Sequence, residues 1–330
     1  MKRDKETVGA TECSRKEIRT SCSMRTAMRE LLFWVFSGAF VFITGAASLK
    51  AQERFHGAFT EQFDGAMPEH FTLSHFRHAE EADFRYTPGA PSLSEKGTSV
   101  MLYRIDPDDP AGAGKGPEII SKHFTHYGTY SARLRIPAAA RVQPNVGAVV
   151  GYFTYNMERE AGLSEIDWEW LIADPHLVYI GTWTGTNDCL QRVGRTINLA
   201  TGTILNTIYR SPRDGNKNHP LTGLQCQPET VPAIEGYDAS ARFYTYGFDW
   251  LPDRLTWWIL HPETGERIVL WDYQGTTPDF TGIPTNRTRY RLNFWHTNNW
   301  SVDTNPLSKE APLYPYEVEI DWMSYMPMEK

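Results

Sequence analysis

One segment of this chain constrains its fold more than any other. Ser164-Glu-Ile-Asp-Trp-Glu-Trp-Leu171 alternates strictly between acidic and apolar residues. A period of two residues is that of a β-strand, in which successive side chains point to opposite faces. Glu165, Asp167 and Glu169 are therefore predicted on one face, and the apolar face is predicted to be buried between two sheets. Neighbouring like charges repel one another and raise each other's pKa, which costs stability. A row of three acidic residues therefore indicates a functional role.

The rest of the chain indicates an all-β fold. The chain has 11 Trp and 16 Tyr beside 21 Pro and 25 Gly, a balance typical of short strands joined by turns. Helical periodicity is hard to find after the N-terminal segment. These features predict a two-sheet antiparallel β-sandwich. The predicted strands are Ser99–Ile105, Tyr127–Ile136, Gly147–Tyr155, Leu163–Leu171, Val178–Trp183, Phe243–Trp250, Leu255–Leu260, Arg289–Trp295 and Tyr316–Tyr325.

The first 51 residues differ from the rest. Basic residues are followed by an apolar stretch over 31–44 and then by small residues up to Ala51, which is the layout of a secretory signal peptide. The alternative is an uncleaved N-terminal membrane anchor, since about 17 apolar residues is the lower limit for spanning a bilayer. Both alternatives place residues 52–330, which show no linker or repeat, outside the cytoplasm as a single secreted or periplasmic domain.

The polar stretch 187–238 is predicted to be a long loop insertion, because it carries several Pro and Gly residues. Loops of this length are usually functional or disordered. It contains Cys189 and Cys226, the two cysteines outside the N-terminal segment. They pair in an oxidising compartment or remain free thiols, and the sequence leaves both possibilities open.

Charge and cysteine spacing exclude several classes of function. The formal net charge is −7 and no long basic block follows the N-terminus, so a nucleic-acid partner is not expected. There is no CxxC pair and no His/Cys cluster with zinc spacing, so no transition-metal site is expected. We expect a monomer that binds a neutral polymer and needs no cofactor for catalysis.

The acidic face matches the needs of glycoside cleavage, which uses one ionised and one protonated carboxyl group. Glu165 is the predicted nucleophile, Glu169 the general acid and then base, and Asp167 the residue that hydrogen-bonds the nucleophile. A flat strand would separate the Cα atoms of the two glutamates by about 13 Å, whereas a retaining pair of carboxyl groups lies ~5 to 5.5 Å apart. The strand is therefore predicted to be concave. The alternatives are a calcium site, which favours flexible loops, and an exposed acidic strand.

The motif Glu165-Ile-Asp-Trp-Glu169 resembles the catalytic signature of glycoside hydrolase family 16, in the form without a bulge that bacterial lichenases and plant xyloglucan transglycosylases carry. The resemblance extends over residues 55–325 and implies a concanavalin A-like jelly roll with a substrate cleft on its concave face. The other segments in the family's order are Tyr127–Leu134, Phe153–Tyr155, Tyr237–Pro252, Asn293–Trp295 and Glu319–Trp322.

The resemblance also implies binding residues, for each of which core packing is the alternative. Asp321 resembles a ligand of a structural calcium ion, and Gly181 stands where lichenases commonly carry Asn, which leaves the substrate open. The implied sugar-contacting residues are Glu118, Phe153, Tyr155, Trp183, Trp295 and Trp300.

The function predicted from the motif and the resemblance together is that of a secreted, retaining endo-β-glucanase. Its expected substrate is a β-1,3/1,4-linked polysaccharide, cleaved through a covalent glycosyl-enzyme intermediate. One alternative is a transglycosylase on the same scaffold, in which a sugar hydroxyl replaces water. The other is a non-catalytic glycan-binding lectin, which the three intact carboxylates disfavour.

Overall fold

The computed structural model describes residues 54–64, 67–76, 101–105, 116–187, 189–211, 217–221, 230–275, 277–297 and 309–329. All of them belong to one compact unit, Leu49–Lys330. The predicted signal peptide or anchor, residues 1–51, lies outside these ranges. None of the described residues is helical, so no helix that could cross a membrane occurs among them.

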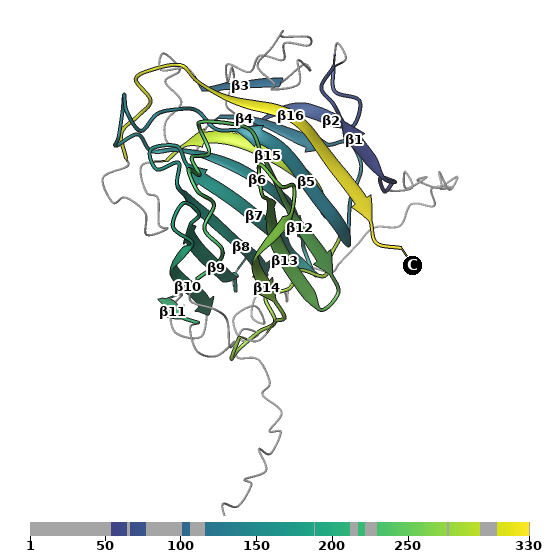
Figure 1. Ribbon diagram of the computed structural model, residues 1–330. Coiled ribbons are helices and arrows are strands. Elements are labelled where there is room, and N and C mark those ends of the chain that lie inside the picture. The colour runs from purple at the N-terminus through teal and green to yellow at the C-terminus, as the bar shows by residue number, and fades with distance from the viewer. Residues whose placement is uncertain are drawn as a thin grey trace, which may run out of the picture. The chain divides into compact units, whose positions relative to one another are not determined.

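The described residues form sixteen β-strands in two sheets, which lie face to face (Figure 1). Every strand pair within the two sheets is antiparallel, which confirms the predicted two-sheet β-sandwich.

The seven-stranded sheet has the order β1-β16-β5-β12-β13-β14, and β3 also pairs with β16. Its strands are β1 (Phe59–Glu61), β3 (Met101–Ile105), β5 (Gly128–Arg135), β12 (Tyr244–Leu251), β13 (Arg254–Leu260), β14 (Arg267–Tyr273) and β16 (Tyr316–Pro327).

The nine-stranded sheet has the order β11-β10-β9-β8-β7-β6-β15-β4-β2, so the chain crosses between the sheets several times, as in a jelly roll. Its strands are β2 (Phe71–Phe76), β4 (Gly116–Ser121), β6 (Ala148–Glu158), β7 (Gly162–Leu171), β8 (Leu177–Gly185), β9 (Gln191–Asn198), β10 (Thr203–Ser211), β11 (Lys217–Pro220) and β15 (Arg289–His296).

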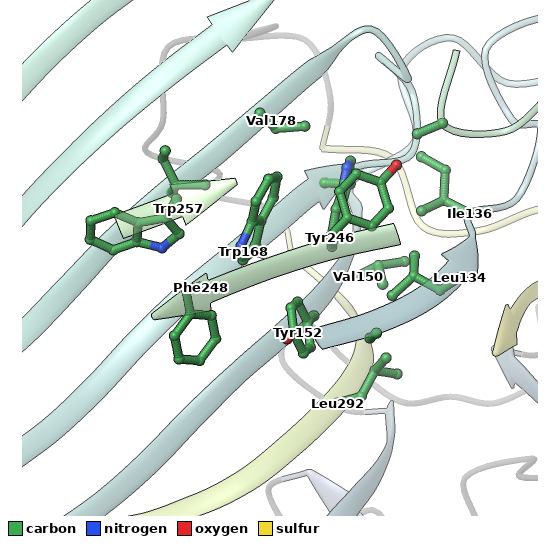
Figure 2. Close-up of a cluster of buried hydrophobic side chains, with 14 of the residues drawn as sticks. Leu134, Ile136, Val150, Tyr152, Trp168, Val178, Tyr246, Phe248, Trp257 and Leu292 are labelled. Carbon is green, nitrogen blue, oxygen red and sulfur yellow. The ribbon is translucent and has the colours of Figure 1, made fainter. Parts of the chain in front are cut away.

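The core lies between the two sheets and is rich in aromatic side chains. Figure 2 shows Trp168 of β7 among buried side chains that include Tyr246 and Trp257. The rings of Trp168 and Tyr246 have centroids 5.1 Å apart, and the Trp168 indole donates a hydrogen bond of 3.3 Å to the carbonyl of Gly247. The Trp168 ring is buried and its N–H has a hydrogen-bond partner on the opposite sheet. These contacts fix the position of β7 against that sheet.

All nine predicted strands are present, with ends that differ by a few residues. The prediction of a long loop over 187–238 was wrong, because β9, β10 and β11 lie within it. The physical reason is visible in β9, where the core-facing residues are Val193, Arg195 and Ile197. Arg195 interrupts the apolar alternation, but it is buried and donates to Thr207 Oγ1 at 3.0 Å and to the Leu270 carbonyl at 3.2 Å.

Cys189 lies between β8 and β9 and is disulfide-bonded. The other three cysteines of the chain, Cys226 included, are outside the described residues.

Candidate active site

Strand β7 presents its three acidic residues on the face of the nine-stranded sheet that points away from the core. Ile166, Trp168 and Trp170 are all fully buried in the core. By alternation Glu165, Asp167 and Glu169 lie on the opposite face, which we call the carboxylate face. β7 pairs with β6 and β8 in continuous register, so the motif contains no bulge. The predicted division of the strand into an apolar and an acidic face is confirmed.

The strands on either side of β7 supply the neighbours of each carboxylate. Side chains directly opposite one another on antiparallel strands lie ~4.5 to 5.5 Å apart at Cβ, so these neighbours line the site. The cross-strand partners on β6 and β8 are Tyr155 and Trp183 for Glu165, Phe153 and Gly181 for Asp167, and Gly151 and Tyr179 for Glu169. Three of the six predicted sugar-contacting residues, Phe153, Tyr155 and Trp183, are therefore adjacent to the acidic row.

The carboxylates are sheltered although they face outward. Asp167 is only 4% exposed, and Glu165 and Glu169 are half-buried. Burial raises the pKa of Glu165, and the Glu169 charge raises it further. Burial also raises the pKa of Glu169, and it raises that of Asp167 well above the usual range, with added repulsion from the two glutamates. The row therefore retains protons that isolated carboxyl groups would lose, which is a requirement for a general acid.

Arg291 on β15 lies at one side of this row. Its positive charge lowers the pKa of Glu165 and opposes the effect of burial. It forms a 2.9 Å ion pair with Glu118 of β4, and its guanidinium carbon is 5.1 Å from the centroid of the Tyr155 ring. Glu118, a predicted sugar-contacting residue, is thus buried and held by Arg291 near the row.

Arg192 on β9 lies at the other side of the row. It is 4% exposed, donates a 3.0 Å hydrogen bond to Asn218 Oδ1, and its charge lowers the pKa of Asp167 and Glu169. Its guanidinium carbon is 5.1 Å from the centroid of the Trp183 ring, and that of Arg210 on β10 is 5.6 Å from the same ring. Arginine side chains thus flank the carboxylate row on both sides, Arg291 from β15 and Arg192 from β9.

Tyr179 is a residue of this site that the sequence analysis missed. Its ring lies across Gly181 and Gly194, which are paired on β8 and β9. A Cβ added at Gly181 would lie 2.6 Å from the Tyr179 hydroxyl oxygen, and one at Gly194 would lie 2.4 Å from it. The two glycines therefore make room for the phenol beside the carboxylates. The strand parity of β8, which places Tyr179, Gly181 and Trp183 on one face, is the signal that could have identified it.

The remaining predicted site residues lie elsewhere. Trp295 is on the carboxylate face of β15, but its partner on β6 is Val149, so it is not beside the acidic row, and it packs against the core. Trp300 is outside the described residues. A groove along the carboxylate face stays a prediction.

The predicted calcium role of Asp321 stays a prediction. This residue is on β16 of the other sheet and is buried. Its carboxylate forms an ion pair with the guanidinium of Arg133 on β5, so a cation is already supplied by the protein. Within the described part of the chain, no group of three or more His, Cys, Asp or Glu side chains is arranged to hold a metal ion.

Comparison with known proteins gives the same class of protein as the motif. No family model matches the chain. It is 26% identical over 218 residues to a beta-glucanase of Acetivibrio thermocellus, an alignment that covers 64% of this chain and 46% of the relative. It is 30% identical over 96 residues to a beta-glucanase of Paenibacillus polymyxa, covering 27% of this chain and 32% of the relative. The chain thus spans less than half the length of the curated relatives that it matches.

Among solved structures, a Bacillus licheniformis beta-glucanase is similar with a TM-score of 0.49 and 20% identity, over 83% of this chain and all of that one. The curated relatives confirm the predicted resemblance to β-glucanases of the family 16 type.

Proposed function

We propose that this protein is a glycoside hydrolase that cleaves a β-linked glucan. The observation that carries the proposal is the row of three sheltered carboxyl groups on β7, whose pKa values are raised and which aromatic side chains flank. The similarity to proteins named beta-glucanase supports the same reaction class.

The proposed first step forms a covalent glycosyl-enzyme. A carboxylate oxygen of Glu165 attacks the anomeric carbon while the bond from that carbon to the glycosidic oxygen breaks. Glu169 gives its proton to the departing oxygen, so the leaving sugar is released as an alcohol. Arg291 favours the ionised form of Glu165 that this step needs.

In the second step, Glu169 acts as a base because it has lost its proton. It takes a proton from water, the water oxygen bonds to the anomeric carbon, and the ester bond to Glu165 breaks. The product keeps the anomeric configuration of the substrate. Asp167, between the two glutamates on the same face, keeps their protonation states apart by sharing a proton with its neighbours.

The substrate contacts of the proposal come from the aromatic neighbours of Glu165 and Asp167. Trp183 and Tyr155 are half-buried, so part of each ring is open to a ligand, and aromatic faces suit the apolar faces of pyranose rings. The proposed substrate is a β-1,3/1,4-linked glucan. The basic and then apolar layout of residues 1–51 supports a location outside the cytoplasm.

The test is reducing-sugar release by the purified protein and its Glu165→Gln variant on mixed-linkage β-glucan, laminarin, xyloglucan and carboxymethylcellulose. We expect activity on at least one polymer and a loss of about 10⁴-fold or more in the variant, because the nucleophile is removed. Glu263→Gln, an exposed glutamate in the β13–β14 turn, is the matched control and should keep full activity.

Binding of every polymer without turnover would contradict the proposal and support the lectin alternative. Adding oligosaccharide acceptors separates hydrolysis from transglycosylation, since a transglycosylase would make longer products.

A further inference from the structure

The carboxylate face continues beyond Trp183 into two arginines that the proposed reaction does not use directly. The register of the sheet places Glu165, Trp183, Arg192 and Arg210 in one row across β7, β8, β9 and β10. Both guanidinium carbons lie within 5.6 Å of the Trp183 ring centroid. Two positive charges are therefore gathered around one half-buried aromatic ring, a single strand away from the predicted nucleophile.

The charges at the two sides of the carboxylate row are balanced differently. On the β15 side, Arg291 is paired with Glu118, and Arg287 is paired with Glu158 at 2.8 Å. Arg289 on the same side is in no ion pair among the described residues, but it donates a 2.8 Å hydrogen bond to the carbonyl of Ser121. On the β9–β10 side, none of the ion pairs among the described residues includes Arg192 or Arg210. The Nε atoms of both arginines are buried and have no hydrogen-bond partner in that part of the chain.

Part of this positive charge is accounted for by the acidic row. Arg192 lowers the pKa of Asp167 and Glu169, so it balances the catalytic carboxylates. Arg210 is not among the groups that shift the pKa of Glu165, Asp167 or Glu169. Arg210 is thus a second cation beside Arg192, and two like charges close together repel one another unless an anion joins them. A planar guanidinium with free N–H donors recognises carboxylate or sulfate-like oxygens best.

We propose that Trp183, Arg192 and Arg210 form a subsite for an anionic substituent of the polysaccharide. The group recognised is an oxyanion on the sugar, either a sulfate half-ester or a carboxylate, held by the guanidinium groups while the sugar ring contacts Trp183. This inference rests on the proposed function, because it places the subsite beside the reacting bond. The net charge of the whole chain is −7, so general attraction of a polyanion does not account for such binding.

The test uses three forms of one polymer: neutral mixed-linkage β-glucan, the same glucan carrying sulfate half-esters, and the same glucan oxidised at C6 to carboxylates. Binding to the full-length Glu165→Gln protein is measured by calorimetry at low and high salt. We expect tighter binding of one charged form than of the neutral polymer, weakened by salt. The form that binds more tightly identifies the anionic group.

Arg210→Gln, added to this background, should weaken binding of that form about tenfold and leave the neutral polymer unaffected. Arg242→Gln is the matched control, because Arg242 also lies over an aromatic ring, 5.7 Å from the Tyr244 centroid, outside the carboxylate face. This control variant should bind all three forms of the polymer as tightly as the Glu165→Gln protein does. Arg210→Lys keeps the charge and should retain part of the salt-dependent binding, which separates a lost charge from a misfolded hairpin.

The inference is overturned if the neutral polymer binds as tightly as both charged forms, or if Arg210→Gln binds like the control. Hydrolysis assays with the unmutated protein separate this failure from that of the proposed function. Cleavage of the neutral glucan, together with no effect of Arg210→Gln on the binding of either charged form, retains the hydrolase and removes the subsite. Arginine-dependent binding without cleavage of any form retains the subsite and removes the hydrolase.

Discussion

The two faces of β7 show how one strand serves both stability and chemistry. On the core face, Ile166, Trp168 and Trp170 are fully buried and pack against the opposite sheet. On the carboxylate face, acidic side chains are sheltered at a cost in free energy, because burial and mutual repulsion disfavour their charged forms. The strand is thus held in place by one face while the other carries groups that would not be stable there alone. Substitutions on the two faces should separate these contributions.

The largest effect on stability is expected on the core face. Trp168→Ala should lower the free energy of unfolding by about 3 to 5 kcal/mol, because it leaves a large cavity between the sheets. Trp183→Ala, which removes the same side chain from the half-buried outer face, should cost much less stability but weaken polysaccharide binding. Denaturant unfolding and binding measured on both variants test this. Equal losses of stability would contradict the proposed division between the faces.

The second-largest effect is expected from a substitution on the carboxylate face, and it is a gain in the free energy of unfolding. The folded-state pKa of Asp167 is raised, so the folded protein retains a proton that the unfolded chain has lost, and stability decreases as pH rises above about 4. Asp167→Asn removes this effect. We expect the variant to be about 1 to 3 kcal/mol more stable than the unmodified protein at pH 8, with little difference near pH 4.

Thermal unfolding of both proteins across this pH range is the measurement. Activity should fall at the same time, since the proton shared by the row is lost. A variant that is less stable at pH 8 than the unmodified protein would show that Asp167 is stabilised in its charged form.

The smallest effect is expected at Tyr179. Its hydroxyl is buried without a hydrogen-bond partner among the described residues, so Tyr179→Phe should change the unfolding free energy by less than about 1 kcal/mol. Any loss of kcat should be below about tenfold. Gly194→Ala is the contrasting variant, because its Cβ would lie 2.4 Å from the hydroxyl and would move the ring. Steady-state kinetics should show the greater loss in the glycine variant, and the opposite order would contradict the role of the glycines as space for the phenol.

The sequence predicts the fold well where alternation is strict and the core-facing residues are apolar. This is the case for β7, whereas the other eight predicted strands follow from their aromatic and β-branched residues and from the turn residues that bound them. The prediction fails in β9, where buried Arg195 finds its partners in β10, the next strand, and in β14, 75 residues away along the chain. Such a partnership depends on tertiary contacts, which a local pattern of residues does not contain.

The candidate site is likewise predictable from the sequence only in part. The acidic row follows from the period of one strand, and Tyr155 and Trp183 follow from their resemblance to positions of a known family. Arg291 and Tyr179 were missed because their roles depend on cross-strand register. Asp321 was assigned to calcium by resemblance alone, and its pairing with Arg133 of a neighbouring strand was not visible in the motif.

The buried contacts of Arg195 have a mechanical consequence. Its guanidinium crosses from β9 to the Leu270 carbonyl of β14 and lies 4.7 Å from the centroid of the Trp271 ring, so it fastens the two sheets together beneath the β9–β10 hairpin. The same hairpin carries Arg192 and Arg210 on its outer side. A force that a long polymer exerts on those two arginines would therefore be transmitted to both sheets. The hairpin would resist separation from the rest of its sheet.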